Sequence, residues 1–211
     1  MSDHDLYFNF QPIVIDNFFT ESELADIYDM RFNIAPTKTT PDGDSLVFVD
    51  SSCGYETSGY MSKPYILKKI EKTMQEHIPV KISVSNEVGE SHGIHIPRYS
   101  LKSGSKPQLR PHYDVGLQYA SFTLSIQLEK SMDWPVCVGD QCFTLDKNQA
   151  VLFSGSHQIH WRPDIEFKEN DFYDIIVCQA VENTRNPLIL DDAHRAKMQE
   201  EADNFVRKYF T

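Results

Sequence analysis

Apolar and polar residues follow one another with two different periods along this chain of 211 residues. In residues 20–30 and 63–77 the apolar residues recur every three or four positions, which is the spacing of an amphipathic helix. Thr20 and Glu23 have the spacing of a capping box at the start of the first segment. Pro79 ends the second segment, because proline cannot continue a helix. We therefore expect two helices early in the chain.

From Val80 onwards the period changes to two, which is typical of strands with one face on a core. Short runs rich in β-branched and aromatic residues follow one another and are separated by polar residues. The expected strands cover residues 8–18 (a strand, then a turn), 46–49, 80–84, 92–99, 118–128, 137–145, 150–153, 158–162 and 172–180. Two segments rich in turn-forming residues, 33–44 and 51–59, are expected to be loops.

Residues 191–211 return to a helical spacing. Five of their residues are expected to be buried: Ala193, Met198, Ala202, Phe205 and Val206. Many short strands after two helices predict a mainly β protein with flanking helices (α+β), built as a β-sandwich or jelly roll. The length and the 40% hydrophobic content suit a single domain over residues 1–211. Its parts would be an N-terminal segment (about 1–79), a core (about 80–182) and a C-terminal helix (about 190–211).

The net charge of −11 argues against a nucleic-acid partner, because phosphate binding needs a basic face. Lys102, Lys106 and Arg110 could still form a local basic funnel for an anionic ligand, or they could simply be solvated. No apolar run approaches the roughly 20 residues of a membrane span, and the first residues lack the pattern of a signal peptide. We expect a cytoplasmic protein without membrane contact.

The four cysteines, Cys53, Cys137, Cys142 and Cys178, include no Cys-x-x-Cys pair. The spacing between Cys137 and Cys142 is poor for zinc. In an acidic chain without a signal peptide we expect all four to be reduced thiols with a structural role.

The strongest chemical signal is His112-x-Asp114 together with His160. At a strand end the period of two puts His112 and Asp114 on one face, and a jelly roll brings a later strand back beside an earlier one. Two histidines and one carboxylate on three neighbouring positions form the facial triad of non-haem Fe(II) sites that activate O₂. His157, in a Ser-rich turn, is expected to be solvated instead.

Two other histidines, His92 and His95, are three residues apart. On a strand this spacing puts them on opposite faces, so we interpret them as ordinary strand and loop histidines.

Several of these features together resemble a known family. The quoted residues are Ile13-Val14-Ile15-Asp16-Asn17-Phe18, Tyr99, Ser103-Gly104, His112-x-Asp114, Thr123-x-x-x-Gln127-Leu128, Ala150-Val151-Leu152-Phe153-Ser154-Gly155 and His160. Over roughly residues 10–181 the chain resembles the prolyl-4-hydroxylase-like branch of the 2-oxoglutarate/Fe(II) oxygenases. The resemblance implies a double-stranded β-helix with a cupin-like core. It also implies a dioxygenase that oxidises 2-oxoglutarate to succinate and CO₂ and hydroxylates a C–H bond of a small molecule or a peptidyl side chain.

The chain departs from that family at one position. Family members usually carry Arg or Lys about ten residues after the second histidine, where this chain has Glu169-Asn170-Asp171. Arg162 would share a strand face with His160, and its planar fork suits the distal carboxylate of 2-oxoglutarate. Lys168 is the alternative anchor, and a surface ion pair with Asp164 or Glu166 is the alternative role for Arg162.

Tyr99 and Gln127 match family positions that line the 2-oxoglutarate pocket. No catalytic residue is expected beyond the metal ligands, because the reactive chemistry belongs to the metal, 2-oxoglutarate and O₂. The carboxylate of Asp114 favours hydroxylation over halogenation, while desaturation and ring formation remain open. A different class also remains open: a cupin-like metal-binding module, or a metalloenzyme that does not use 2-oxoglutarate. A plain structural β-sandwich is the third possibility.

Overall fold

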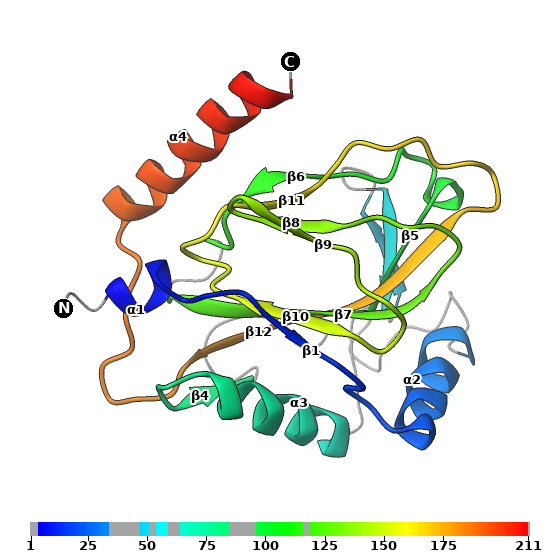
Figure 1. Cartoon of the computed structure of the whole chain (residues 1–211), viewed down its shortest axis with the longest axis horizontal. Helices are drawn as coiled ribbons and strands as arrows, with labels where there is room; N and C mark the ends of the chain where they lie inside the picture. Colours follow the sequence, from blue (N-terminus) through cyan, green and yellow to red (C-terminus); the bar gives the residue numbers. More distant parts are fainter. Residues whose placement is uncertain are drawn as a thin grey trace.

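The structure is a computed structural model that describes residues 4–33, 47–50, 54–58, 64–84, 96–115 and 119–210. Two antiparallel sheets face each other, and Figure 1 shows them as two layers. The larger sheet has the order β1-β10-β7-β12-β5-β3-β2, with β4 paired to β12, and the smaller has the order β6-β11-β8-β9.

The strands of the larger sheet are β1 (Ile13–Ile15), β2 (Val47–Asp50), β3 (Tyr55–Ser58), β4 (Ile82–Ser83), β5 (Ile96–Ser100), β7 (Ser121–Lys130), β10 (Ala150–Phe153) and β12 (Phe172–Glu182). The strands of the smaller sheet are β6 (Leu109–His112), β8 (Val136–Val138), β9 (Gln141–Phe143) and β11 (His160–Arg162). This is the predicted jelly roll, with two facing sheets made of strands that are distant in the sequence.

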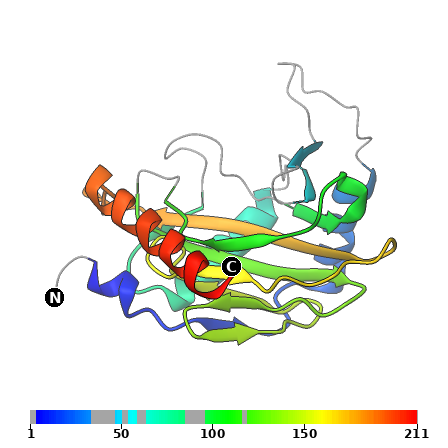
Figure 2. The same cartoon turned by 90° about the horizontal axis from the view of Figure 1, so that it is seen from above.

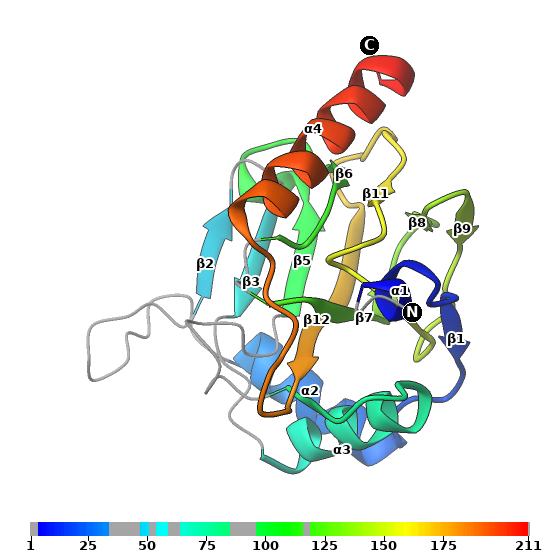
Figure 3. The ribbon, with the colours of Figure 1, turned by 90° about the vertical axis from the view of Figure 1, so that its left-hand side faces the viewer.

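Four α-helices and one 3₁₀ turn complete the described chain: α1 (Asp5–Phe8), α2 (Glu21–Asn33), α3 (Pro64–His77), α4 (Asp192–Tyr209) and η1 (Leu101–Ser103). Helices α2 and α3 cover the outer face of the larger sheet, whereas α4 lies on the opposite side of the molecule (Figures 1 and 3). Helix α4 contacts β6 and extends along the outside of the body (Figure 2). In the described part of the chain no helix has the length and apolar character needed to cross a membrane.

Strand β7 shows why the sequence forms these layers. Its apolar residues Phe122, Leu124, Ile126 and Leu128 belong to the core under α2 and α3. Burying each such side chain contributes about 1.5–3 kcal/mol, which holds the helices on the sheet. The residues between them are polar and equally buried: Ser121, Thr123, Ser125 and Gln127. Because side chains alternate across a strand, this polar row faces the smaller sheet.

The two early helices are confirmed. Thr20 and Glu23 form the predicted capping box: the Thr20 backbone N–H donates to Glu23 Oε2 at 2.7 Å, and the Glu23 backbone N–H donates to Thr20 Oγ1 at 3.3 Å. The helix that ends before Pro79 is α3. Strand β10 has the predicted bounds.

Three local predictions are wrong. Residues 5–8 form the short helix α1, so the first strand is only Ile13–Ile15. Residues 55–58 of the expected loop form β3, which pairs with β5. The expected strand 137–145 is a hairpin, because Gly139 has a positive φ of 60° and turns the chain between β8 and β9. The expected loop over residues 34–44 lies outside the described residues.

Two predictions about side chains also fail. In α4, Met198 and Ala202 are buried and Phe205 and Val206 are half-buried, but Ala193, in the first turn, is exposed. Cys137 and Cys142 are not reduced thiols. They are opposite each other in the β8–β9 hairpin and form a disulfide with a Cα–Cα distance of 4.0 Å. Cys178 is a free, buried thiol as expected, and Cys53 lies outside the described residues.

Candidate metal centre

His112, Asp114 and His160 come together where the ends of two strands meet. His112 is the last residue of β6, His160 is the first residue of β11, and the two are directly paired in the smaller sheet. Asp114 follows β6 by two residues. Asp114 Oδ1 lies 3.6 Å from His112 Nε2 and 3.5 Å from His160 Nε2. The three side chains each offer one ligand atom to a common point and could hold one metal ion.

The backbone fixes the orientation of both imidazole rings in the same way. His112 Nδ1 lies 2.7 Å from the carbonyl oxygen of Arg110, and His160 Nδ1 lies 3.0 Å from that of Gln158. A carbonyl oxygen can only accept, so each Nδ1 carries the hydrogen and each Nε2 presents its lone pair toward Asp114. This is the arrangement by which outer-shell partners prepare histidine for a metal.

Asp114 is held by the larger sheet and by the β10–β11 loop. Thr123 Oγ1 on β7 donates a hydrogen bond to Asp114 Oδ2, which leaves Oδ1 directed at the two histidines. The Asp114 backbone N–H donates to the Gly155 carbonyl oxygen at 2.9 Å. A Cβ atom on Gly155 would collide with Thr123 Oγ1 and Asp114 Oδ2, so glycine is needed there for close approach.

The charges of Asp114 and His112 suit a bound cation, whereas His160 has to release a proton to bind one. Burial would raise the pKa of Asp114, but the neighbouring His160 and His112 and the hydrogen bond from Thr123 hold it well below its ordinary value. Partial burial and the nearby His160 lower the pKa of His112 to about 4. Burial opposes protonation of His160, but the Asp114 carboxylate outweighs it and raises the His160 pKa. The carboxylate therefore stays ionised at neutral pH and His112 stays neutral, which are the ligating forms.

Arg162 lies two residues beyond His160, and its side chain is buried between the sheets at 3% exposure. Its guanidinium carbon lies 5.2 Å from the centre of the Trp134 ring and 4.6 Å from that of Tyr173, and Nη1 donates to the Trp134 carbonyl oxygen. Its Nε and Nη2 are buried without a hydrogen-bond partner among the described residues. A surface ion pair is therefore excluded for Arg162, and Asp164 instead pairs with Lys106.

The other residues predicted for a 2-oxoglutarate pocket differ in their surroundings. Tyr99 is buried in the same aromatic cluster as Arg162, with its ring centre 5.0 Å from that of Trp134. Gln127 is fully buried, and its amide donates to the carbonyl oxygens of Glu129 and Asp174 at 3.0 and 3.1 Å. Lys168 is exposed.

One prediction about the rival histidines is wrong. His157 is not solvated: it is 4% exposed, because α1 and α4 cover it. His92 and His95 lie outside the described residues. Lys102 and Arg110 are exposed. Exposure is compatible both with a local basic funnel for an anionic ligand and with simple solvation.

Sequence reasoning gave no role to the residues that support the site. Thr123 and Gly155 hold Asp114, and the hydroxyl oxygens of Ser121, Ser125 and Ser154 are buried without a hydrogen-bond partner in the described part of the chain. A signal was present: the run from Ser121 to Leu128 alternates polar and apolar residues, although β7 is a central, buried strand. Polar groups on the buried face of such a strand indicate a site, since unpaired buried polar groups are costly.

No protein-family model matches the chain, and no curated protein sequence matches it. Among solved structures, the chain is similar to the viral collagen prolyl hydroxylase of Paramecium bursaria Chlorella virus-1 in complex with 2OG, with 12% identity and a TM-score of 0.51 over 80% of this chain and 94% of that one. It is also similar to a 2OG-Fe(II) oxygenase-family oxidoreductase from Burkholderia pseudomallei, with 10% identity and a TM-score of 0.50 over 80% and 83% of the two chains. The predicted fold is therefore confirmed: the chain has the double-stranded β-helix of the 2-oxoglutarate/Fe(II) oxygenases.

Proposed function

We propose that this protein is an Fe(II)- and 2-oxoglutarate-dependent dioxygenase. It would hydroxylate a C–H bond of a small molecule or of a peptidyl side chain and release succinate and CO₂. The observation that carries the proposal is the convergence of His112 Nε2, Asp114 Oδ1 and His160 Nε2 where the ends of β6 and β11 meet, with both histidine tautomers fixed by backbone carbonyls.

In this proposal His112, Asp114 and His160 are the ligands of Fe(II). The donor set fits this ion, because a hard carboxylate and two borderline imidazoles on one face are typical of non-haem Fe(II) sites. When bound, iron together with 2-oxoglutarate and O₂ supplies the oxidising power of the reaction. The chain orients the ligands: Thr123 and Gly155 hold Asp114, and the carbonyls of Arg110 and Gln158 hold the two rings.

Arg162 is proposed as the anchor for the distal carboxylate of 2-oxoglutarate. A buried guanidinium whose Nε and Nη2 lack partners among the described residues is costly alone and suits an anionic ligand, because a carboxylate can accept from both. Tyr99 would line the same pocket through the Trp134 cluster. Gln127 lies opposite Ile175 of this cluster and would line it with Oε1, since its amide hydrogens are engaged elsewhere.

The carboxylate of Asp114 also bears on the reaction type. A halogenating site needs a small residue there to leave room for a halide, and Asp114 fills that position. Hydroxylation is therefore the reaction we propose, and product analysis distinguishes it from desaturation or ring closure.

The test is an anaerobic titration of metal-free protein with Fe(II) and then with 2-oxoglutarate, followed by visible spectroscopy. Chelation of iron by 2-oxoglutarate gives a weak charge-transfer band, and subsequent exposure to O₂ should form succinate. The variants His112→Ala and Asp114→Ala should lose the band and the succinate, whereas His77→Ala, at the exposed end of α3, should keep both. If Fe(II) binds but neither signal appears, the protein is a cupin-like metal-binding module that does not use 2-oxoglutarate.

A further inference from the structure

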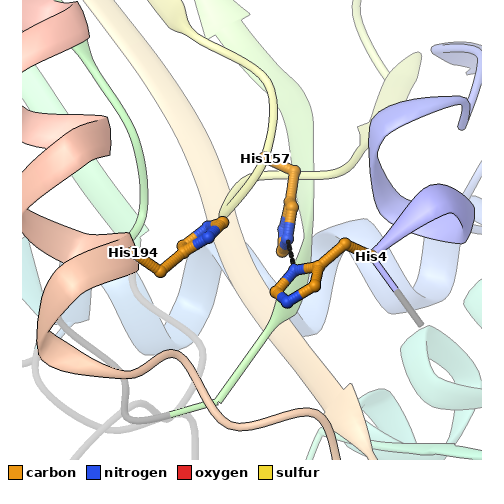
Figure 4. Close-up of side chains that lie close together, drawn as sticks. All are labelled: His4, His157 and His194. Atoms are coloured by element: carbon orange, nitrogen blue, oxygen red, sulfur yellow. Dashed lines mark hydrogen bonds between the residues drawn. The ribbon is translucent and has the colours of Figure 1, made fainter. Parts of the chain in front are cut away.

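A second group of histidines lies apart from the three proposed iron ligands. His4 directly precedes α1, His157 lies in the loop between β10 and β11, and His194 lies in the first turn of α4. Figure 4 shows the three imidazole rings gathered from these three segments. His4 Nδ1 lies 2.9 Å from His157 Nε2, and one nitrogen of each ring lies within 4.8 Å of the others.

The surroundings of His157 fix which of its nitrogens faces the cluster. His157 Nδ1 lies 2.8 Å from Ser156 Oγ. That hydroxyl accepts from the Ser121 backbone N–H at 2.9 Å and reaches the Ser121 carbonyl oxygen at 3.2 Å. With the single hydroxyl hydrogen of Ser156 on the carbonyl oxygen, His157 Nδ1 donates to Ser156 Oγ. His157 Nε2 then presents its lone pair to His4 and His194.

His194 provides an independent indication of a ligand. Its Nε2 is buried and has no hydrogen-bond partner in the part of the chain that the structure describes. Its ring stacks on that of His4 with centres 4.8 Å apart, and its centre lies 5.0 Å from that of His157. A buried imidazole nitrogen without a partner beside two further imidazoles is a costly arrangement unless something bridges them.

The electrostatics favour a metal cation over a proton as the bridge. Burial and the two neighbouring histidines lower the pKa of His157 to about 3, and burial and His4 also lower the pKa of His194. Both rings are therefore neutral at pH 7, which is the form that binds a metal. Among the residues that the structure describes, no carboxylate belongs to this ligand group, in contrast to the group around Asp114. An all-imidazole set suits Zn²⁺ better than it suits hard cations such as Mg²⁺ or Ca²⁺.

We propose that His4, His157 and His194 bind one Zn²⁺ ion, with a water molecule in the fourth position. Tetrahedral coordination at about 2.0–2.1 Å separates the ligand nitrogens by about 3.3–3.4 Å. The His4–His157 pair has to open by a few tenths of an ångström, and His194 has to turn inward. Both His4 and His194 are half-buried and lie at the surface ends of α1 and α4, where such rotations are possible.

The consequence is a clamp that joins three distant segments. The ion would fasten the N-terminal segment and the start of α4 to the β10–β11 loop. The same loop carries Gly155, which holds the Asp114 backbone, and leads into His160. Zn²⁺ would thus stabilise the support of the first metal group without being one of its ligands.

The test uses a chelator-stripped His112→Ala/Asp114→Ala double variant, so that Zn²⁺ cannot bind at the first group. This background should bind one equivalent of Zn²⁺ in a competition titration with a metal-binding dye, and Zn²⁺ should raise its Tm. Adding His4→Ala or His194→Ala should weaken Zn²⁺ binding by about 100-fold or more and abolish the shift in Tm. Adding His77→Ala should change neither.

A further variant examines the support of His157. Ser156→Ala should keep the stoichiometry of one but weaken Zn²⁺ binding about 10- to 100-fold, as loss of an outer-shell partner does. Ser156 is buried, so the His4 and His194 variants decide the proposal even if Ser156→Ala fails to fold. The proposal is overturned if the background binds no Zn²⁺, or if it binds one equivalent that neither His4→Ala nor His194→Ala weakens. Neither outcome depends on whether the first group binds iron.

Discussion

Arg162→Met separates a cosubstrate anchor from a structural cation. Methionine has a similar length and an apolar side chain, so it fills the space between Trp134 and Tyr173 without a charge. If Arg162 serves the fold, its loss should destabilise the protein whether or not a ligand is present. If it serves 2-oxoglutarate, the substitution should hardly change the free energy of unfolding of the metal-loaded protein in the absence of 2-oxoglutarate.

The structure allows the net contribution of Arg162 to the free energy of unfolding to be estimated. Two buried donors without described partners, Nε and Nη2, cost about 1–3 kcal/mol each. Against this stand two cation–π contacts of about 1–2 kcal/mol each. The hydrogen bond to Trp134 adds about 1.5–3 kcal/mol. The terms nearly cancel, so Arg162→Met should change the free energy of unfolding by less than about 2 kcal/mol in the absence of 2-oxoglutarate.

The assay is equilibrium urea unfolding under anaerobic conditions with Fe(II), with and without 2-oxoglutarate. At 100 times its Kd, 2-oxoglutarate should stabilise the wild type by about 2.7 kcal/mol, and Arg162→Met should lose this gain. Arg98→Met is the matched control, because Arg98 pairs in bidentate fashion with Asp174, which is 1% exposed. The free energy of unfolding of that variant should fall by about 3–5 kcal/mol, and 2-oxoglutarate should still stabilise it as it stabilises the wild type. If Arg162→Met instead loses more than 3 kcal/mol without ligand and keeps the full response, the anchor assignment is wrong.

Three further predictions follow from local geometry. Gly155→Ala places a methyl group against Asp114 Oδ2, so Fe(II) affinity in the titration should fall at least about 10-fold; an unchanged affinity would contradict the packing argument. His157 has a pKa of about 3 in the folded state against about 6.5 in the unfolded state, so in the presence of chelator this residue should lower the free energy of unfolding by about 2 kcal/mol at pH 5. His112, whose pKa is lowered to about 4, adds a loss of its own, so urea unfolding at pH 7.5 and 5 should show a loss that is about 2 kcal/mol smaller in His157→Gln than in the wild type, and equal losses would contradict the argument. Reduction of the Cys137–Cys142 disulfide, which closes a short loop, should cost no more than about 2 kcal/mol in the same assay, and a larger loss would show that the hairpin depends on it.

The fold could be predicted because apolar and polar residues alternate along its strands, and this period of two is visible in the sequence. Strand β10 has the predicted bounds, because a short apolar run between polar turns fits few structures other than a buried strand. The apolar face of β7 likewise identifies it as a strand. His112, Asp114 and His160 could be grouped because a period of two and one return of the jelly roll suffice to bring them together. Each of these inferences needs only local sequence and one topological rule.

The remaining features depend on contacts that no local pattern reports. His157 looked solvated in its Ser-rich turn, but His4, which is 153 residues away, covers it. The disulfide follows from register: Gly139 and Asp140 make a two-residue hairpin turn, and that turn sets Cys137 opposite Cys142. Gly-Asp is a pair typical of a two-residue hairpin turn, but the prediction treats residues 137–145 as one continuous strand.

The alternation of β11 explains why both groups of histidines depend on the same short segment. His160 and Arg162 point between the sheets, so Trp161 must point outward, where its ring centre lies 4.9 Å from that of Phe205 on α4. Helix α4 thus supports β11 from outside at Trp161, and its first turn reaches the loop before β11 through His194. A strand of three residues has little stability of its own, and one register slip would turn His160 away from Asp114. The helix at Trp161 and the histidine cluster in the preceding loop hold the strand in register, which is what a site built on alternate residues requires.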